Sequence, residues 1–315
     1  MAQLVKLLDY ISRYENDLTR YPNQFLRLKR YHWDRMKIQW EQGSGHTIWE
    51  QFPEEKEKKG FSSLLRFFAP RQEEQEDFEP EDIEEEDDFG FNPNIVHAPD
   101  TIEQLYKLYL DQLFHFQIKW ASSTLVDKSR VAPKYMRDSL LRSFAQELPD
   151  SYLLFYNPII KLQQAPVELD IIIVTPVECM CITILEEEDL AAFIGSSNRF
   201  WTKRFRDKES KLLNPLISLN RMGKIVSQLF KEKETDFPIR KYLVSRNGYI
   251  DYPTSAFDVK VIDRRTYADW FSSIGALTTP LKFAQFQAAQ IILDVGQTTA
   301  VSQLFEHEED GEEKG

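Results

Sequence analysis

Apolar residues recur at helical spacing in two groups within the first forty positions. The first group predicts a helix and consists of Leu4, Leu7, Leu8, Ile11 and Tyr14. Pro22 then interrupts the pattern, and a second helix is predicted over residues 25–40, with basic side chains mostly outside its apolar stripe. Two helices joined at a proline predict an αα-hairpin.

The next hundred residues contain two stretches of contrasting charge. Residues 56–71, KEKKGFSSLLRFFAPR, combine a basic start with an apolar cluster, which suits packing within the domain or docking to a membrane surface or a partner. Residues 73–88 hold twelve acids and no base, a composition typical of a disordered linker. Thr101 with Gln104 then forms a capping box that starts a new helix.

From residue 133 the pattern predicts one more helix, to residue 148, and then changes to short apolar runs typical of strands. The predicted strands are SYLLFY, VELDIIIV, CMCITILE, KYLVS and DVKVID; the predicted later helices lie near 214–231, 265–273 and 281–294. Three consecutive strands followed by alternating helices and strands indicate an α/β fold.

Composition adds limits on location. The 315-residue chain has two cysteines, Cys179 and Cys181, which suits a reducing cytoplasm and buried apolar packing. We expect no signal peptide, because no apolar h-region follows the first residues. We expect no transmembrane segment, because the longest apolar run is interrupted by Asp170, Pro176 and Glu178. The net charge is −12, but residues 73–88 contribute −12 and residues 306–314 contribute −5, so the remainder is mildly basic at +5.

The order of elements in residues 134–275 resembles the nuclease-related domain (NERD), a branch of the restriction-endonuclease-like fold. The resemblance rests on YMRDSLLRSF, SYLLFY, LDIIIV with Asp170, the hairpin strand after it, NRFWTK, and NPL opening a helix at Asn214. The first 33 residues resemble the N-terminal region of a Bacillus-type subset. The resemblance implies a restriction-endonuclease-like mixed sheet flanked by helices, with a helical N-terminal module, in a bacterial protein.

The resemblance also implies a metal site. In that fold an Asp on one hairpin strand and a Glu on the next hold Mg²⁺ or Mn²⁺, and a Lys two residues after the Glu stabilises the charge that develops on the phosphate. If the hairpin carries an insertion, Asp170 and Glu186 are the metal ligands and Glu188 takes the lysine position. Asp138, in the preceding helix, is a conceivable further ligand.

An ungapped hairpin gives a different result. A turn at Thr175–Glu178 pairs Val174 with Cys179, so that Asp170 faces Thr183. Leu185 then stands in the lysine position, and the metal site is lost. Both alignments remain open at this point, and both lack the lysine.

The stretch NRFWTKRFRDKESK interleaves basic and aromatic residues around Phe200, Trp201 and Phe205. Positive charge for phosphates and aromatic faces for bases are the usual parts of a nucleic-acid site. The candidate binding residues are Arg199, Trp201, Lys203, Arg204, Arg206 and Lys211. The alternative is a loop whose Trp201 fills the core.

We therefore expect four regions: a helical module at 1–71, an acidic disordered linker at 72–99, the nuclease-related α/β domain at 100–302 and an acidic disordered tail at 303–315. The leading hypothesis is a degenerate core, a pseudoenzyme, that binds nucleic acid or a partner without cleavage. One alternative is an active Mg²⁺- or Mn²⁺-dependent nuclease using Asp170, Glu186 and Glu188. The other is a protein-interaction module working through residues 1–70.

Overall fold

The structure is a computed structural model that describes residues 1–43, 91–95, 99–162, 165–252 and 258–302. The apolar stretch at 56–71, the acidic run at 73–88 and the acidic tail at 303–315 lie outside these residues. The chain forms two compact units, one of residues 1–29 with 110–315 and the other of residues 30–109.

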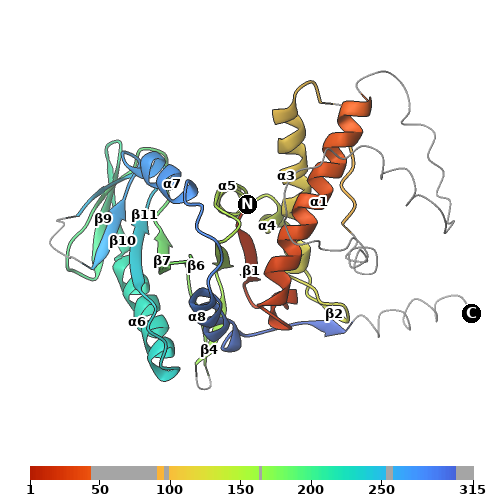
Figure 1. Ribbon diagram of the computed structural model, residues 1–315. Coiled ribbons are helices and arrows are strands. Elements are labelled where there is room, and N and C mark those ends of the chain that lie inside the picture. The colour runs from red at the N-terminus through yellow and green to blue at the C-terminus, as the bar shows by residue number, and fades with distance from the viewer. Residues whose placement is uncertain (44–90, 96–98, 163–164, 253–257, 303–315) are drawn as a thin grey trace, which may run out of the picture. The chain divides into compact units, whose positions relative to one another are not determined.

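A six-stranded mixed sheet forms the centre of the first unit, in the order β1-β3-β6-β7-β11-β13 (Figure 1). Every neighbouring pair is parallel except those that involve β6, which runs against both β3 and β7. The strands are β1 (Gln3–Leu7), β3 (Leu153–Tyr156), β6 (Ile171–Val174), β7 (Cys179–Ile184), β11 (Ile239–Val244) and β13 (Val259–Ile262).

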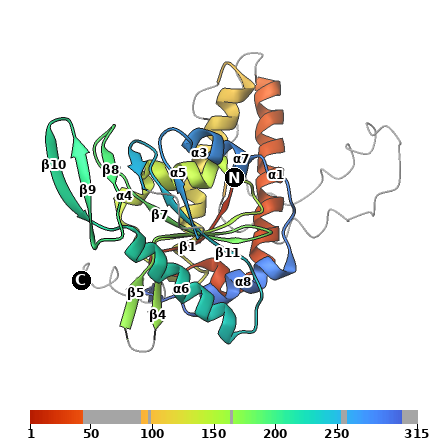
Figure 2. The ribbon, with the colours of Figure 1, turned by 90° about the vertical axis from the view of Figure 1, so that its left-hand side faces the viewer.

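Helices cover both faces of this sheet (Figure 2). On one face lie α6 (Leu216–Glu232) and α8 (Phe283–Asp294), and on the other lie α5 (Ser139–Glu147) and α7 (Tyr267–Gly275). Trp270 of α7 packs on Tyr242 of β11, and Phe271 packs on Phe144 of α5. The prediction of a mixed α/β sheet flanked by helices is confirmed.

The prediction of a helix over the first fifteen residues is wrong. Residues 3–7 form the edge strand β1, which pairs in parallel with β3, and only a short 3₁₀ turn, Arg13–Glu15, follows. Gln117 covers the outer side of β1: its side chain accepts a hydrogen bond from the amide of Leu4 and donates one to the carbonyl of Ala2, both at 2.8 Å. The strand is therefore enclosed on both faces and along its edge, which a helical apolar spacing does not reveal.

The second predicted helix is present as α1 (Arg20–Gly43), and Pro22 lies in its first turn, where proline is tolerated. The helix predicted from the capping box is α3 (Ile102–Trp120), and Thr101 Oγ1 accepts the amide of Gln104 at 3.3 Å. In the first unit, Trp120 packs edge-on against Tyr14 and Phe25.

The second unit contains the later part of α1 and the first part of α3. Trp33 packs against Tyr106 with ring centroids 4.9 Å apart, and buried His32 packs against Phe91 at 5.0 Å. The indole of Trp40 donates to the carbonyl of Pro99 at 2.7 Å.

A second sheet of four strands, in the order β10-β9-β8-β12, follows β7 along the chain. Its strands are β8 (Ala192–Ile194), β9 (Phe200–Phe205), β10 (Lys208–Leu213) and β12 (Tyr249–Asp251). The predicted helix over 133–148 is divided into α4 (Pro133–Met136) and α5, because Asp138 caps α5 through the amides of Leu140 and Leu141. The remaining short elements are β2 (Asp127–Lys128), β4 (Ile159–Leu162), β5 (Ala165–Glu168) and β14 (Val301–Ser302).

None of the helices in the described residues combines the length and the apolar character needed to cross a bilayer.

Candidate functional site

The hairpin of β6 and β7 has the ungapped register. Ile172 pairs with Cys181 and Val174 pairs with Cys179. Asp170 consequently lies opposite Thr183, and the hydroxyl of Thr183 donates to Asp170 Oδ2 at 2.5 Å. The carboxylate that the resemblance assigns to a metal ion is thus hydrogen-bonded to a neutral hydroxyl.

Glu186 lies apart from Asp170. It follows the end of β7, and its partner Arg246 lies near Tyr156 and Tyr267, on the face of the sheet that α5 and α7 cover. There it accepts two hydrogen bonds from the Arg246 guanidinium, at 2.5 Å to Nε and 2.7 Å to Nη2. Leu185, in the family's lysine position, is buried and cannot supply a charge.

Arg246 belongs to a polar cluster beneath α5 and α7. Tyr156 donates its hydroxyl proton to Asp138 Oδ2 at 2.8 Å. Burial raises the pKa of Tyr156 well above its usual range, the Asp138 charge raises it further, and the nearby Arg246 cation opposes both. The Glu186 hydrogen bonds raise the pKa of Arg246. Asp138, the conceivable rescuing ligand, is therefore engaged as a helix cap and by Tyr156.

Glu188 has a third environment. Lys203 Nζ donates to Glu188 Oε2 at 2.9 Å and to Glu187 Oε2 at 3.2 Å. The hydrogen bond from Lys203 lowers the pKa of Glu188. The three candidate carboxylates thus have three different partners: Thr183, Arg246 and Lys203.

A shared Mg²⁺ or Mn²⁺ does not fit this arrangement of Asp170 and Glu186. The implied site needs Asp170 and Glu186 to face the same ion, but the Glu186 carboxylate holds the Arg246 guanidinium. Among the described residues no three His, Cys, Asp or Glu side chains lie together in a way that could hold a metal ion. Cys179 and Cys181 are buried, free thiols.

The basic-aromatic stretch forms an antiparallel hairpin, β9–β10, rather than a loop. Directly opposed residues share a face, and successive pairs alternate between faces. The pairs on the outer face are Phe200 with Leu213, Thr202 with Lys211, and Arg204 with Glu209. The inner face carries Trp201, Lys203 and Phe205.

This alternation divides the predicted binding residues. Trp201 is 1% exposed, stacks on Tyr252 with ring centroids 5.3 Å apart and donates its indole N–H to the carbonyl of Ser196. In this conformation Trp201 fills the core and offers no free face to a base, the alternative that the sequence left open. Lys203 also faces inward, to Glu187 and Glu188, as described above.

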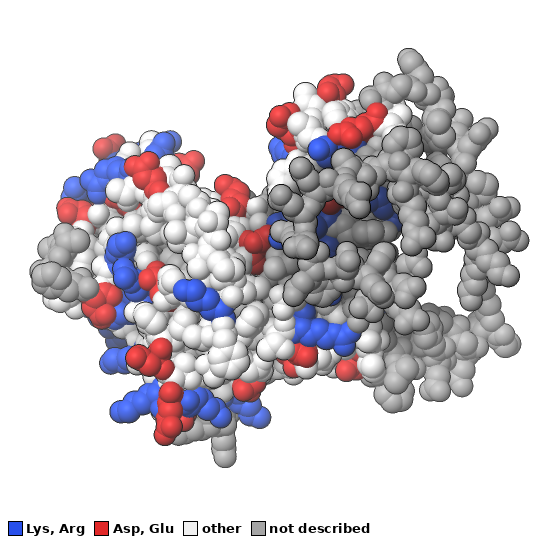
Figure 3. All heavy atoms as spheres, in the orientation of Figure 1, with Lys and Arg blue, Asp and Glu red and all other residues white. Residues whose placement is uncertain are grey.

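The other basic residues remain at the surface. Arg204 is exposed and bound to Glu209 at 2.6 Å, and Arg206 forms the turn, with a φ of 52°. Arg199 and Lys211 are exposed, and within the described part of the chain neither forms an ion pair. Figure 3 shows Lys and Arg side chains over the small sheet, interspersed with carboxylates.

A pocket of about 350 Å³ lies beside the outer face of the hairpin. Arg199, Lys211 and Phe200 line it, together with Ser196, Asn198 and Thr202. Phe200 is 51% exposed. The pocket therefore combines two cations with an accessible aromatic ring, although sequence analysis did not place Phe200 among the binding residues.

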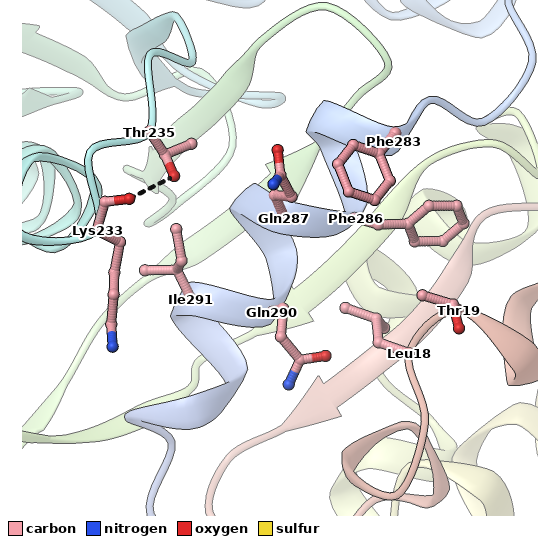
Figure 4. Close-up of a pocket in the computed structure, with 9 residues that line it drawn as sticks. All are labelled: Leu18, Thr19, Lys233, Thr235, Phe283, Phe286, Gln287, Gln290 and Ile291. Carbon is pink, nitrogen blue, oxygen red and sulfur yellow. Dashed lines mark hydrogen bonds between the residues drawn. The ribbon is translucent and has the colours of Figure 1, made fainter.

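A second pocket, of about 320 Å³, lies between α8, the end of α6 and the segment before α1 (Figure 4). Phe283, 73% exposed, and Phe286 line it with Leu18 and Ile291. Lys233 is the one charged residue among those that line it. The lining of this second pocket is mainly apolar, so it lacks the two cations and the accessible aromatic ring found together beside β9.

Two comparisons with known proteins give a match, and both matches cover only part of the chain. A curated protein from Geobacillus stearothermophilus, described as an RNA 2',3'-cyclic phosphodiesterase, is 54% identical over 41 residues. That match covers 13% of this chain and 13% of that protein. No solved structure matches the chain. The family model of the nuclease-related domain matches residues 135–245, from α4 to the end of β11. The chain therefore carries a nuclease-related domain, NERD, over these residues.

Proposed function

We propose that this nuclease-related domain binds nucleic acid without cleaving it. The observation that carries the proposal is the separation of the two hairpin carboxylates: Asp170 is held by Thr183, and Glu186 is held by Arg246. Each carboxylate has its own hydrogen-bond donor within the fold, and for Glu186 that donor is also a cation.

Hydrolysis of a phosphodiester makes demands that these residues do not meet. A bound Mg²⁺ or Mn²⁺ would polarise the phosphate and activate water, and a nearby cation would stabilise the transition state. Thr183 and Leu185 supply neither a ligand charge nor a cation at the positions implied by the fold. Arg246, the cation in this region, is paired with Glu186.

Binding of a nucleic acid requires only accessible positive charge, and the β9–β10 hairpin supplies it. Arg199 and Lys211 present positive charge on an open surface, where phosphates can reach them. An exposed cation that has no carboxylate partner loses little interaction energy when a phosphate replaces the water around it. This surface supports nucleic acid as the partner.

A cleavage assay tests the first half of the proposal. The purified full chain is incubated with labelled single- and double-stranded DNA and RNA in Mg²⁺ and in Mn²⁺, beside an Asp170→Ala variant. RNA is included because the name of the Geobacillus relative refers to it. We expect no metal-dependent cleavage. Cleavage by the parent chain that disappears in Asp170→Ala would establish the alternative, a metal-dependent nuclease using Asp170, Glu186 and Glu188.

A salt titration tests the second half. Fluorescence anisotropy with a labelled oligonucleotide gives the dissociation constant from low to moderate salt, and the affinity should fall with salt as counterions are released. The double variant Arg199→Gln/Lys211→Gln removes two phosphate contacts, so the slope of log K against log [salt] should become shallower by about 1.4 for a single strand.

The matched control is Lys224→Gln/Lys231→Gln, which removes two exposed lysines from α6 and should leave the slope unchanged. An absence of binding at low salt would refute the nucleic-acid proposal and favour a protein partner bound through residues 1–70.

A further inference from the structure

The outer face of the β9–β10 hairpin exposes apolar surface that the fold does not use. Phe200 and Leu213 form a cross-strand pair at the open end of the hairpin and are 51% and 53% exposed. Their neighbour Trp201, one residue along the same strand, is buried. The strand thus directs one aromatic ring inward for packing and leaves the adjacent ring at the surface.

Positive charge lies next to this exposed pair. Lys211 pairs with Thr202, the next position on the same face, about 6.6 Å along the strand from Phe200. Arg199 precedes Phe200, and its guanidinium lies 5.7 Å from the phenyl centroid. Arg199, Phe200 and Lys211 line one pocket of about 350 Å³, a volume at the lower end of the range for small-ligand sites.

A flat apolar ring between two cations matches one unit of a nucleic-acid strand, which has a flat base and a charged phosphate. The ring can stack only on a base whose face is free, and in a duplex both faces of an internal base are covered by its neighbours. A duplex would reach the cations through its phosphates but would leave Phe200 without a partner. The surface therefore favours unpaired strands.

We infer that the outer face of the β9–β10 hairpin is a single-strand nucleic-acid site, in which Phe200 stacks on an unpaired base while Arg199 and Lys211 hold the adjoining phosphate. This inference rests on the proposed function and specifies its substrate class. Trp201 and Lys203 act from the inner face as positioning residues, because they anchor the hairpin to the body of the domain.

Anisotropy measurements with the full chain test the inference. The probes are labelled oligo(dT) and oligo(U) of equal length, beside a labelled DNA duplex and a labelled RNA duplex of that length. The parent chain should bind at least one single strand about tenfold or more tightly than the matching duplex. Phe200→Ala should weaken single-strand binding by about 10- to 100-fold and leave duplex binding unchanged.

Phe283→Ala is the matched control, because it makes the same change at an exposed phenylalanine of α8 that lines the other pocket. It should leave all affinities unchanged, and Phe200→Tyr, which keeps a stacking ring, should retain single-strand binding. Photocrosslinking to an oligonucleotide that contains 5-iodouracil should label the peptide containing Phe200.

Two outcomes separate this inference from the proposed function. Parent binding that is equal for single strands and duplexes, or unchanged in Phe200→Ala, would overturn the single-strand site and leave nucleic-acid binding intact. An absence of binding to all probes at low salt would overturn both.

Discussion

The β6–β7 hairpin and the β9–β10 hairpin both carry charged side chains, but they place those charges in different surroundings. At β6–β7, Asp170 and Glu186 each have a partner inside the fold, and both are partly buried. On the outer face of β9–β10, Arg199 and Lys211 border an open pocket. The comparison teaches that two neighbouring hairpins of one nuclease-related domain can differ in how their charges are satisfied: by partners within the fold at β6–β7, and by solvent on the outer face of β9–β10.

Lys203 connects the two regions. It projects from the inner face of β9 to Glu187 and Glu188, which follow β7. The acidic cluster that the resemblance offers to a metal ion therefore helps to attach the second hairpin. A surface ion pair of this kind contributes little stability, so its role is mainly to set position.

The largest expected difference concerns the two neighbouring aromatic residues of β9. Trp201→Ala should lower the free energy of unfolding by about 3 kcal/mol, because it removes a buried ring and leaves a cavity. Phe200→Ala should change it by less than about 0.5 kcal/mol, because the ring is half exposed. Urea denaturation followed by circular dichroism measures both. Equal losses would show that Phe200 is part of the packing rather than an open binding surface.

A smaller difference in the free energy of unfolding is expected between variants that break two different ion pairs. Arg246→Met should lower the free energy of unfolding by about 2 kcal/mol, because it leaves the partly buried Glu186 carboxylate without its bidentate partner. Arg204→Met, which removes the exposed pair with Glu209, should cost less than about 0.5 kcal/mol.

The double variant Arg246→Met/Glu186→Leu also removes the carboxylate left without a partner, so it should recover much of the lost free energy of unfolding. If Arg246→Met and Arg204→Met cost the same, the pairing of Glu186 would be too weak to keep it from a metal ion.

The sequence predicted five of the six strands of the main sheet, all except β1, because their signals are local. The apolar runs after residue 151 are bounded by turns, and the four-residue turn at Thr175–Glu178 gave the observed register, with Asp170 opposite Thr183, as one of two open alternatives. The helices α6, α7 and α8 follow from periodicity and were predicted within a few residues.

The errors arose where the deciding contact lies far along the chain. β1 was predicted as a helix, because its enclosure depends on Leu153–Tyr156 and on Gln117, more than a hundred residues away. Arg246 was missed as the partner of Glu186, since sixty residues separate them. The split between Phe200 and Trp201 was missed because a charged, aromatic hairpin lacks the apolar alternation that indicates a strand and its buried face.

The smallest predicted effect is on the pH dependence of the free energy of unfolding. It tests whether solvent reaches the region beneath α5 and α7. The folded-state pKa of Tyr156 is raised above its ordinary value of 10.0, first by burial and then by Asp138. The unfolded chain therefore loses this proton at a lower pH than the folded chain, so stability is unaffected below about pH 10 and falls as the pH rises further.

Over one pH unit above that point a single such group costs about 1 kcal/mol. Tyr156→Phe removes this proton, and the free energy of unfolding between pH 10 and pH 11 should decline less steeply by that amount. Urea denaturation across this interval measures the slope for both chains. An unchanged slope would mean that hydroxide reaches Tyr156 in the folded protein, and hence that the cluster containing Arg246 and Glu186 is open enough for a metal ion to compete for that carboxylate.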